Sequence, residues 1–278
     1  MTDPLLPTEW LASHLNDVQV VDATWFMPGE GIGRDSFAAA HIPGAVFFDI
    51  DEIADASSGL PHMLPTAEAF AQAAAALGLT RDRPVVVYDA HGVFSAPRVW
   101  WTLRAMGFPE VSVLDGGLKK WRAEGRPVDR GLPTPASGSL EPRTVRPDLV
   151  RDLATVRDLL STRDAQLVAA RPAPRFRGEA PEPRPGLRSG HMPGACNVPF
   201  GSLVETDGTL KSTEALRSIF EAAGVDLARP IVTTCGSGVT AAGLALALAR
   251  LGREDVPVYD GSWAEWGGRP DTVVVTGA

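Results

Sequence analysis

Short hydrophobic runs alternate with longer helix-like segments along the chain. The runs are nearly continuous and rich in β-branched residues, which is typical of strands covered on both faces. The segments between them are rich in Ala and Leu, and Gly78 and Gly107 follow two of them, where glycine commonly ends a helix. This alternation predicts an α/β protein with mostly parallel sheets flanked by helices. The expected strands are 18–21, 85–88, 111–114, 166–168, 231–234 and 256–259, and the expected helices are 67–77, 95–106, 149–160, 214–223 and 239–251.

The second half of the chain repeats the first, with matched stretches in the same order. The repeat is too long for a solenoid, so it indicates two copies of one domain. Between the copies, 131–147 is rich in Pro, Gly, Ser and Thr, as expected of a linker. We therefore predict domains at 1–132 and 148–278, joined by a linker at 133–147. The matched stretches are 41–45 with 191–195, 83–89 with 229–235, 92–93 with 238–239, 113–117 with 258–262, and Trp121 with Trp266.

The composition argues against several classes of function. The 278 residues include 26 Lys and Arg against 34 Asp and Glu, a formal net charge of −8, so no overall positive field would attract nucleic acid or anionic lipid. Two cysteines are too few for a disulfide framework, and residues 1–7 do not resemble a secretory signal. The longest apolar helical stretch, 244–251, is too short to span a bilayer. We expect a cytoplasmic protein that binds neither nucleic acid nor membrane.

Cys235 lies where a predicted strand meets a predicted helix, at the start of the run Cys-Gly-Ser-Gly-Val-Thr. In parallel sheets, ligands bind beyond the carboxyl ends of the strands. Gly236 and Gly238 let the loop turn tightly with its N–H groups pointing inward, and the start of the helix favours an anion there. The pattern therefore favours Cys235 as a nucleophilic thiolate. A buried structural cysteine in a glycine-rich turn is the alternative.

The first copy carries Asp89 where the second carries Cys235. A nucleophile in one copy and a carboxylate in the other fit an active and an inactive half, although Asp89 also suits the N-cap of a helix. A phosphatase loop would need an arginine six positions after the cysteine, and Ala241 occupies that position. The loop therefore does not support phosphate chemistry.

The duplication and the cysteine loop together resemble the tandem-domain rhodanese family of sulfurtransferases. Within this family, the loop is similar to that of the 3-mercaptopyruvate sulfurtransferases, because Gly236 and Ser237 stand where the thiosulfate enzymes usually carry basic residues. The resemblance implies two rhodanese-like domains, the first non-catalytic and the second catalytic. It covers most of the chain, with further matching segments at 41–45, 95–101, 115–117 and 259–267.

The resemblance also implies a two-step transfer of sulfur. Cys235 would attack the sulfur of 3-mercaptopyruvate and release pyruvate, and the resulting persulfide would pass its sulfur to a thiol such as thioredoxin or a small thiol, or to cyanide in an assay. The N–H groups of Gly236, Gly238, Val239 and Thr240 would bind the anionic sulfur. No metal or organic cofactor is required. A thiosulfate sulfurtransferase and a non-catalytic rhodanese-like module that carries sulfur or docks on a partner remain open alternatives.

Arginines are concentrated between the first strand of the second copy and its His-Met-Pro-Gly turn. A guanidinium group can make two parallel hydrogen bonds to a carboxylate. The resemblance singles out Arg175 and Arg184 as the pair that holds the substrate carboxylate. We interpret Arg171 and Arg188 as solvated surface charges, and Arg177 stays open.

The resemblance implies a relay in which Asp51 orients His62, and His62 polarises the hydroxyl of Ser237 beside the reacting sulfur. Spacing alone does not reveal it, because the three residues lie far apart in the sequence. Judged from the residues alone, a single histidine in a loop is more often structural.

One position departs from the family's pattern. Asp22 follows a predicted strand of the first copy, and the family commonly has Asp at the equivalent place of the second, where this chain has Ala169. Our hypothesis is that Ala169 loosens the site without abolishing it, so that restoring Asp raises activity or stability. We interpret His41, His191 and Cys196 as structural, because the histidines recur in both copies and the cysteine precedes an apolar segment.

Overall fold

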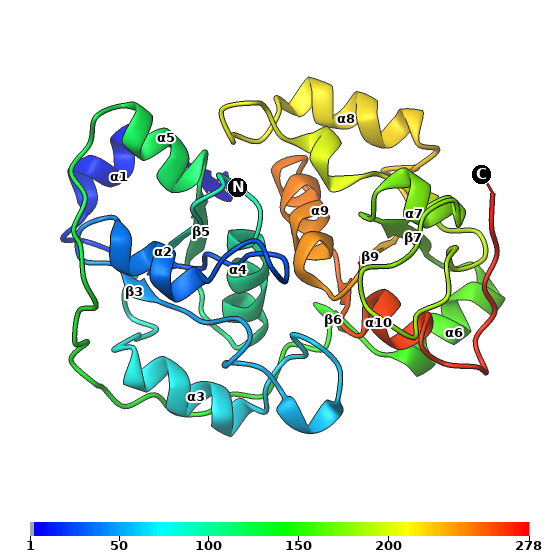
Figure 1. Ribbon diagram of the computed structural model, residues 1–278, viewed down its shortest axis with the longest axis horizontal. Helices are drawn as coiled ribbons and strands as arrows, with labels where there is room; N and C mark the ends of the chain where they lie inside the picture. Colours follow the sequence, from blue (N-terminus) through cyan, green and yellow to red (C-terminus); the bar gives the residue numbers. More distant parts are fainter. Residues whose placement is uncertain (1–2, 278) are drawn as a thin grey trace. The chain divides into compact units, whose positions relative to one another are not determined.

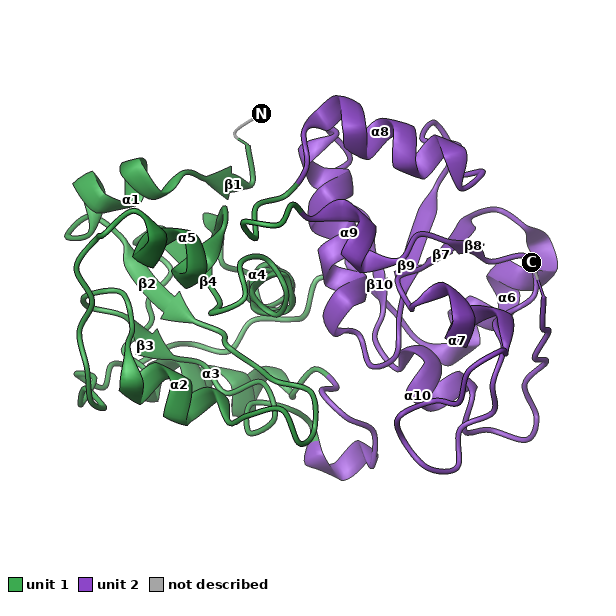
Figure 2. Cartoon of the chain, turned by 45° about the horizontal axis from the view of Figure 1, so that its top comes forward, with its two compact units in different colours: residues 1–55, 64–146, 205–210 green, residues 56–63, 147–204, 211–278 purple. Residues whose placement is uncertain are grey.

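A parallel five-stranded sheet organises each of two compact units in residues 3–277, the part of the chain that the computed structural model describes (Figures 1 and 2). The units follow the two copies of the repeat, except that two short segments are exchanged. Residues 56–63 belong to the second unit, and residues 205–210 belong to the first. Most of the predicted linker, up to Arg146, belongs to the first unit.

The first sheet has the strand order β1-β5-β4-β2-β3, and all of its strand pairs are parallel. Its central strand β4 is buried at every position, as its continuous apolar run predicts. The strands are β1 (Leu5–Leu6), β2 (Gln19–Asp22), β3 (Val46–Phe47), β4 (Val85–Tyr88) and β5 (Val111–Leu114). The helices are α1 (Thr8–His14), α2 (Gly33–Ala39), α3 (Ala67–Ala76), α4 (Ala96–Ala105) and α5 (Gly117–Ala123).

The second sheet repeats this topology in the order β6-β10-β9-β7-β8, again with parallel pairs throughout. Its strands are β6 (Val150–Arg151), β7 (Gln166–Ala169), β8 (Cys196–Asn197), β9 (Ile231–Thr234) and β10 (Val258–Tyr259). Its helices are α6 (Leu153–Thr162), α7 (Ala173–Arg177), α8 (Thr213–Ala222), α9 (Val239–Arg250) and α10 (Ser262–Trp266), and 3-10 turns occupy 56–58 and 200–203. The identical orders confirm the α/β fold and the duplication.

Several boundaries differ from the sequence prediction. The sequence predicts a helix at 149–160, but Val150–Arg151 forms the edge strand β6. The helix begins only after Asp152, whose carboxylate accepts the N–H of Thr155 at 2.8 Å and so caps it. The other missed elements have two to seven residues, which is too short for a hydrophobic period to show.

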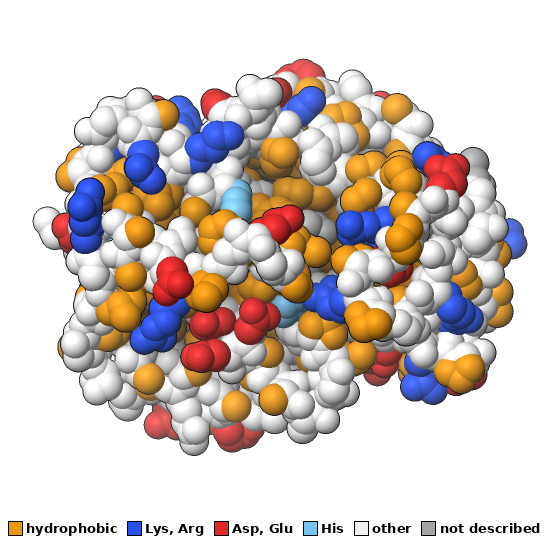
Figure 3. All heavy atoms as spheres, in the orientation of Figure 1, with side chains coloured by type: hydrophobic (Ala, Val, Ile, Leu, Met, Phe, Trp, Pro, Cys, Tyr) orange, Lys and Arg blue, Asp and Glu red, His pale blue; other side chains and the backbone are white. Residues whose placement is uncertain are grey.

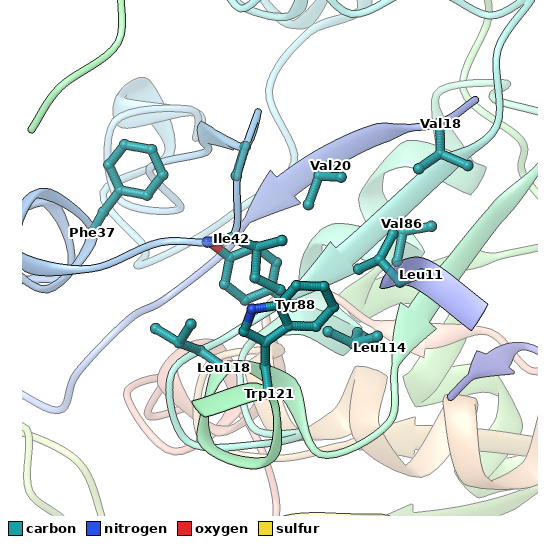
Figure 4. Packing of buried hydrophobic residues seen from close by; sticks show 11 residues of the cluster. Leu11, Val18, Val20, Phe37, Ile42, Val86, Tyr88, Leu114, Leu118 and Trp121 are labelled. Carbon is teal, nitrogen blue, oxygen red and sulfur yellow. The ribbon is translucent and has the colours of Figure 1, made fainter. Parts of the chain in front are cut away.

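The core of each unit is built around its central strand. In the first unit, Tyr88 packs in a buried cluster with Ile42 from the histidine turn and Trp121 from α5 (Figure 4). In the second unit, Tyr259 and Trp263 belong to the corresponding cluster. Tyr88 is the last residue of β4, so the first cluster extends to the start of the loop that begins at Asp89.

On the face that Figure 3 shows, no large surface region carries charge of one sign only. Lys and Arg side chains lie scattered among Asp and Glu there, in keeping with the acidic net charge. Within residues 3–277, no helix combines the length and the apolar character that crossing a membrane requires.

Candidate active site

Cys235 lies directly after β9 and shortly before α9, at the junction that the sequence indicates. The residue is buried, with 2% of its surface exposed. Its backbone is held from both sides, since its N–H donates to Oγ of Ser262 at 3.1 Å and its carbonyl accepts the N–H of Trp263 at 3.0 Å. The start of α10 therefore fixes the cysteine and the direction in which its loop leaves the sheet.

The loop after Cys235 presents its backbone N–H groups as potential donors. Gly238 has a φ of +82°, a left-handed conformation that favours glycine. Across residues 3–277, no protein acceptor lies within hydrogen-bond distance of the N–H groups of 236–241. A run of such donors at the start of a helix is a site for an anion.

The first unit shows what this loop geometry binds. Asp89 takes the place of Cys235 after β4, and its carboxylate accepts five backbone N–H groups of its own loop. Asp89 therefore does more than cap a helix, because both of its carboxylate oxygens accept N–H groups of the loop. Oδ1 accepts from His91 and Gly92 at 2.9 Å, and Oδ2 accepts from Phe94, Ser95 and Ala96 at 2.7, 2.8 and 2.8 Å.

His62 and Ser237 are brought together in the second unit. Nδ1 of His62 and Oγ of Ser237 share a hydrogen bond of 3.0 Å, and each residue is 5% exposed. His62 has a φ of +62°, which is uncommon for a residue with a side chain, so its surroundings hold the imidazole in this position. Ser237 lies in the same loop as the thiol, two residues after Cys235.

Asp51 belongs to the first unit, whereas His62 belongs to the second. The carboxylate of Asp51 accepts the indole N–H of Trp25 at 3.0 Å, and its backbone N–H donates to Asp49. The part of Asp51 in the relay therefore stays a prediction.

Arg171 corrects the interpretation of the arginine-rich segment. It is 5% exposed and is not a solvated surface charge. Its guanidinium donates to Oε1 of Glu182 at 2.5 Å and to the carbonyl of Gly190 at 2.5 Å, and it lies 4.0 Å from the ring centre of Trp263. The sequence did not reveal this, because the partners are spread over three separate segments.

The remaining arginines divide into two groups. Arg188 has a structural role and is not a solvated surface charge. It donates to four backbone carbonyls, including that of Gly267 at 3.1 Å. Arg177, the open case, makes an exposed ion pair with Glu179 at 2.7 Å. Arg175 and Arg184 are both half-buried, as expected of groups that meet a ligand at the surface of a site.

The charges of this segment act on one another. Burial raises the pKa of the Glu182 carboxyl, and the positive charges of Arg171, Arg175 and Arg184 oppose that rise. Burial lowers the pKa of Arg171, whereas Glu182 and Cys235 raise it. Three arginines therefore lie within electrostatic range of one carboxylate, and Arg171 lies within range of the thiol.

The sequence did not single out Ser262, Glu182 or Trp263. Ser262 has a φ of +48° and donates from its hydroxyl to the carbonyl of Tyr259 at 2.8 Å while accepting the N–H of Cys235. The signal was visible in the repeat, because Gly117 stands at the equivalent position of the first copy. Within residues 3–277, no group of His, Cys, Asp and Glu has the arrangement of a metal site.

A duplicated parallel sheet with an anion-binding cysteine loop in one copy defines a double rhodanese. The rhodanese-like domain model matches residues 7–124 and 152–269, and the chain belongs to the rhodanese family. A 3-mercaptopyruvate sulfurtransferase of Escherichia coli is 45% identical over 271 residues, which cover 96% of this chain and 95% of that protein. The thiosulfate sulfurtransferase of Bos taurus is 42% identical over 286 residues, which cover 98% and 95% of the two chains.

The solved structures agree with these relatives. The crystal structure of the 3-mercaptopyruvate sulfotransferase SseA from Escherichia coli matches with a TM-score of 0.87 and 42% identity, over 94% of this chain and 99% of that one. The chain is thus an enzyme of the sulfurtransferase type, and the non-catalytic alternative is set aside.

Proposed function

We propose that this protein transfers the sulfur of 3-mercaptopyruvate through a persulfide on Cys235 to a thiol acceptor and releases pyruvate. The observation that carries the choice of donor is the hydrogen bond between His62 and Ser237 in the loop that bears the thiol. Cleavage of a carbon–sulfur bond leaves an enolate that must gain a proton, whereas thiosulfate leaves as sulfite and needs none. A hydroxyl linked to an imidazole supplies a path for that proton.

The first step balances without any cofactor. The Cys235 thiolate attacks the donor sulfur, a sulfur–sulfur bond forms, and the carbon–sulfur bond breaks with its electron pair going to carbon. The thiol proton of the donor passes through Ser237 and His62 to the enolate carbon, which becomes the methyl group of pyruvate. The products are pyruvate and the Cys235 persulfide anion, so the charge is conserved.

The loop and the arginines stabilise the two negative charges of this step. The N–H groups of 236–240 are donors for the anionic sulfur, by analogy with the carboxylate of Asp89 in the first unit. Arg175 and Arg184 hold the substrate carboxylate in this scheme, and the part of Asp51 in the relay stays a prediction.

In the second step a thiol, such as thioredoxin or a small thiol, attacks the outer sulfur and regenerates Cys235. The donor product leaves before the acceptor reacts, which gives ping-pong kinetics. A cytoplasmic location and a thiol acceptor of this kind are part of the same proposal.

A thiosulfate sulfurtransferase is the second candidate, because relatives that match nearly the whole chain carry that activity in their names. The test supplies each donor separately to wild type, Ser237→Ala and His62→Gln, and follows pyruvate release and cyanolysis. We expect both substitutions to lower kcat with 3-mercaptopyruvate by about 100-fold or more, and with thiosulfate far less. Equal losses with both donors, or faster turnover of thiosulfate by wild type, would overturn the proposed donor.

A further inference from the structure

Arg171 and Glu182 form a buried ion pair in the second unit. The guanidinium donates to the carboxylate at 2.5 Å, and the two side chains are 5% and 3% exposed. Burying two charges is costly, and an apolar pair of similar volume is often at least as stable. Stability alone is therefore a weak reason for charged groups at these positions.

The pair is linked to the cysteine through an aromatic ring. Arg171 stacks on Trp263 at 4.0 Å, and the backbone N–H of Trp263 donates to the carbonyl of Cys235 at 3.0 Å. A second hydrogen bond fixes the guanidinium to the carbonyl of Gly190. Arg171 is thus held in one place, with its charge within electrostatic range of the thiol.

Glu182 is also brought near the proposed substrate arginines. The chain after α7 folds back on the helix, since the N–H groups of Glu179 and Ala180 donate to the carbonyl of Pro174 at 2.8 and 3.2 Å. Arg175 lies on that helix, and Arg184 follows two residues after Glu182. One buried carboxylate therefore lies in the field of three guanidinium groups.

We propose that Glu182 is a positioning residue that also sets the charge of the accepted donor. It fixes Arg171 and offsets one of three positive charges, so that the remaining field suits a donor with a single negative charge. This proposal rests on the proposed function. 3-Mercaptopyruvate with a protonated thiol carries one negative charge, whereas thiosulfate carries two.

The experiment measures kcat/KM for both donors in variants that remove the charge of Glu182, of Arg171 or of both. Glu182→Gln exposes the donor to the full field of three arginines, and we expect the preference for 3-mercaptopyruvate over thiosulfate to fall about tenfold. Arg171→Gln leaves Glu182 unbalanced and should shift the preference the opposite way. In the double variant Arg171→Gln/Glu182→Gln the net charge is restored, and the preference should return to within about twofold of wild type.

Glu179→Gln is the matched control, because it neutralises an exposed carboxylate of the same segment, and it should leave the preference unchanged. Thermal unfolding of every variant reports whether it is folded. If Glu182→Gln does not fold, the change in donor preference of Arg171→Gln tests the role of Glu182. Equal slowing with both donors, or a double variant whose preference departs further than that of either single variant, would overturn the role of Glu182. A wild type that releases no pyruvate from 3-mercaptopyruvate would overturn the proposed function instead.

Discussion

The loops of Asp89 and Cys235 have the same place in the fold and opposite chemistry. Each follows the central strand of its sheet and leads into a buried helix. In the first unit the loop is filled by its own carboxylate, which takes five N–H groups. In the second, a buried thiol replaces the carboxylate, and among the described residues 3–277 the N–H groups of 236–241 have no protein acceptor. The same place in the fold thus holds an internal carboxylate in one copy and, in the other, a thiol beside unpaired backbone donors.

The two copies also differ at the residue that packs against the backbone of Asp89 or Cys235. Gly117 and Ser262 are equivalent, and both have left-handed backbones, with φ of +52° and +48°. A Cβ at Gly117 would lie 2.3 Å from the carbonyl oxygen of Asp89, whereas Ser262 has room for a hydroxyl that accepts the N–H of Cys235. The catalytic copy has thus gained a support for its cysteine that the other copy has no room for.

Loss of the thiol should have the largest effect on activity. Cys235→Ser leaves the loop but removes the nucleophile, so sulfur transfer should fall by more than about 10³-fold. The measurement is cyanolysis, together with mass spectrometry of the protein after exposure to donor, which should show no added sulfur atom. Cys196→Ser is the control and should keep its activity; a persulfide formed by Cys235→Ser would contradict the mechanism.

Removal of the internal carboxylate should have the largest effect on stability. Asp89→Ala leaves five N–H groups without their acceptor, three of them on residues that are themselves buried, and we expect a loss of about 3–5 kcal/mol in the free energy of unfolding. Urea denaturation measures it, with the exposed Asp17→Ala as control. A loss below about 1 kcal/mol would show that water satisfies this loop, and that its likeness to the cysteine loop is superficial.

Asp22 provides a test by pH. Burial raises the pKa of its carboxyl from 3.8 to about 6, against the hydrogen bond that it accepts from Thr24. Because the folded state favours the protonated form, the stability that this group contributes is present below about pH 4 and is lost as the pH rises to about 6. The loss is about 3 kcal/mol.

Asp22→Asn should remove this dependence. The free energy of unfolding of the variant, relative to wild type, should increase between pH 4 and pH 7 by about the same amount. Denaturant titrations at several pH values measure the difference, and parallel profiles of the two proteins would contradict the assignment.

Ser262→Gly makes the second loop more like the first. The N–H of Cys235 loses its acceptor, but the left-handed backbone is relieved by glycine, so stability should change by less than about 1 kcal/mol. We expect kcat to fall about tenfold, because the cysteine backbone is less well fixed. A kcat equal to that of wild type would show that the hydroxyl is dispensable for the reaction.

Ala169→Asp should have the smallest effect. The structure supplies another support at this place, since Nδ2 of Asn197 donates to the carbonyls of Ala169 and Arg171 at 3.0 and 2.9 Å. On this ground we expect a change below about 1 kcal/mol in unfolding free energy. The hypothesis that Ala169 loosens the site instead predicts a rise in activity or stability, and no change in either would contradict it.

Much of this comparison could be predicted from the sequence. The repeat, the central strands and the place of Cys235 follow from continuous apolar runs and from glycines at the following turn, which are local patterns. The burial of Arg171 could not be predicted, because its partners Glu182, Gly190 and Trp263 are distant in sequence. Two-residue strands also escape any periodic pattern, since their position depends on tertiary pairing.

The two segments that belong to the opposite unit determine where the chain can be cut into separate halves. Residues 56–63 are encoded in the first half but fold with the second unit, and 205–210 do the reverse. A single cut at the linker would therefore give a second half without His62 and a first half without the segment whose Leu210 N–H donates to Asp115. A chimaera that combines halves of two relatives should therefore take residues 56–63 with the second unit and residues 205–210 with the first.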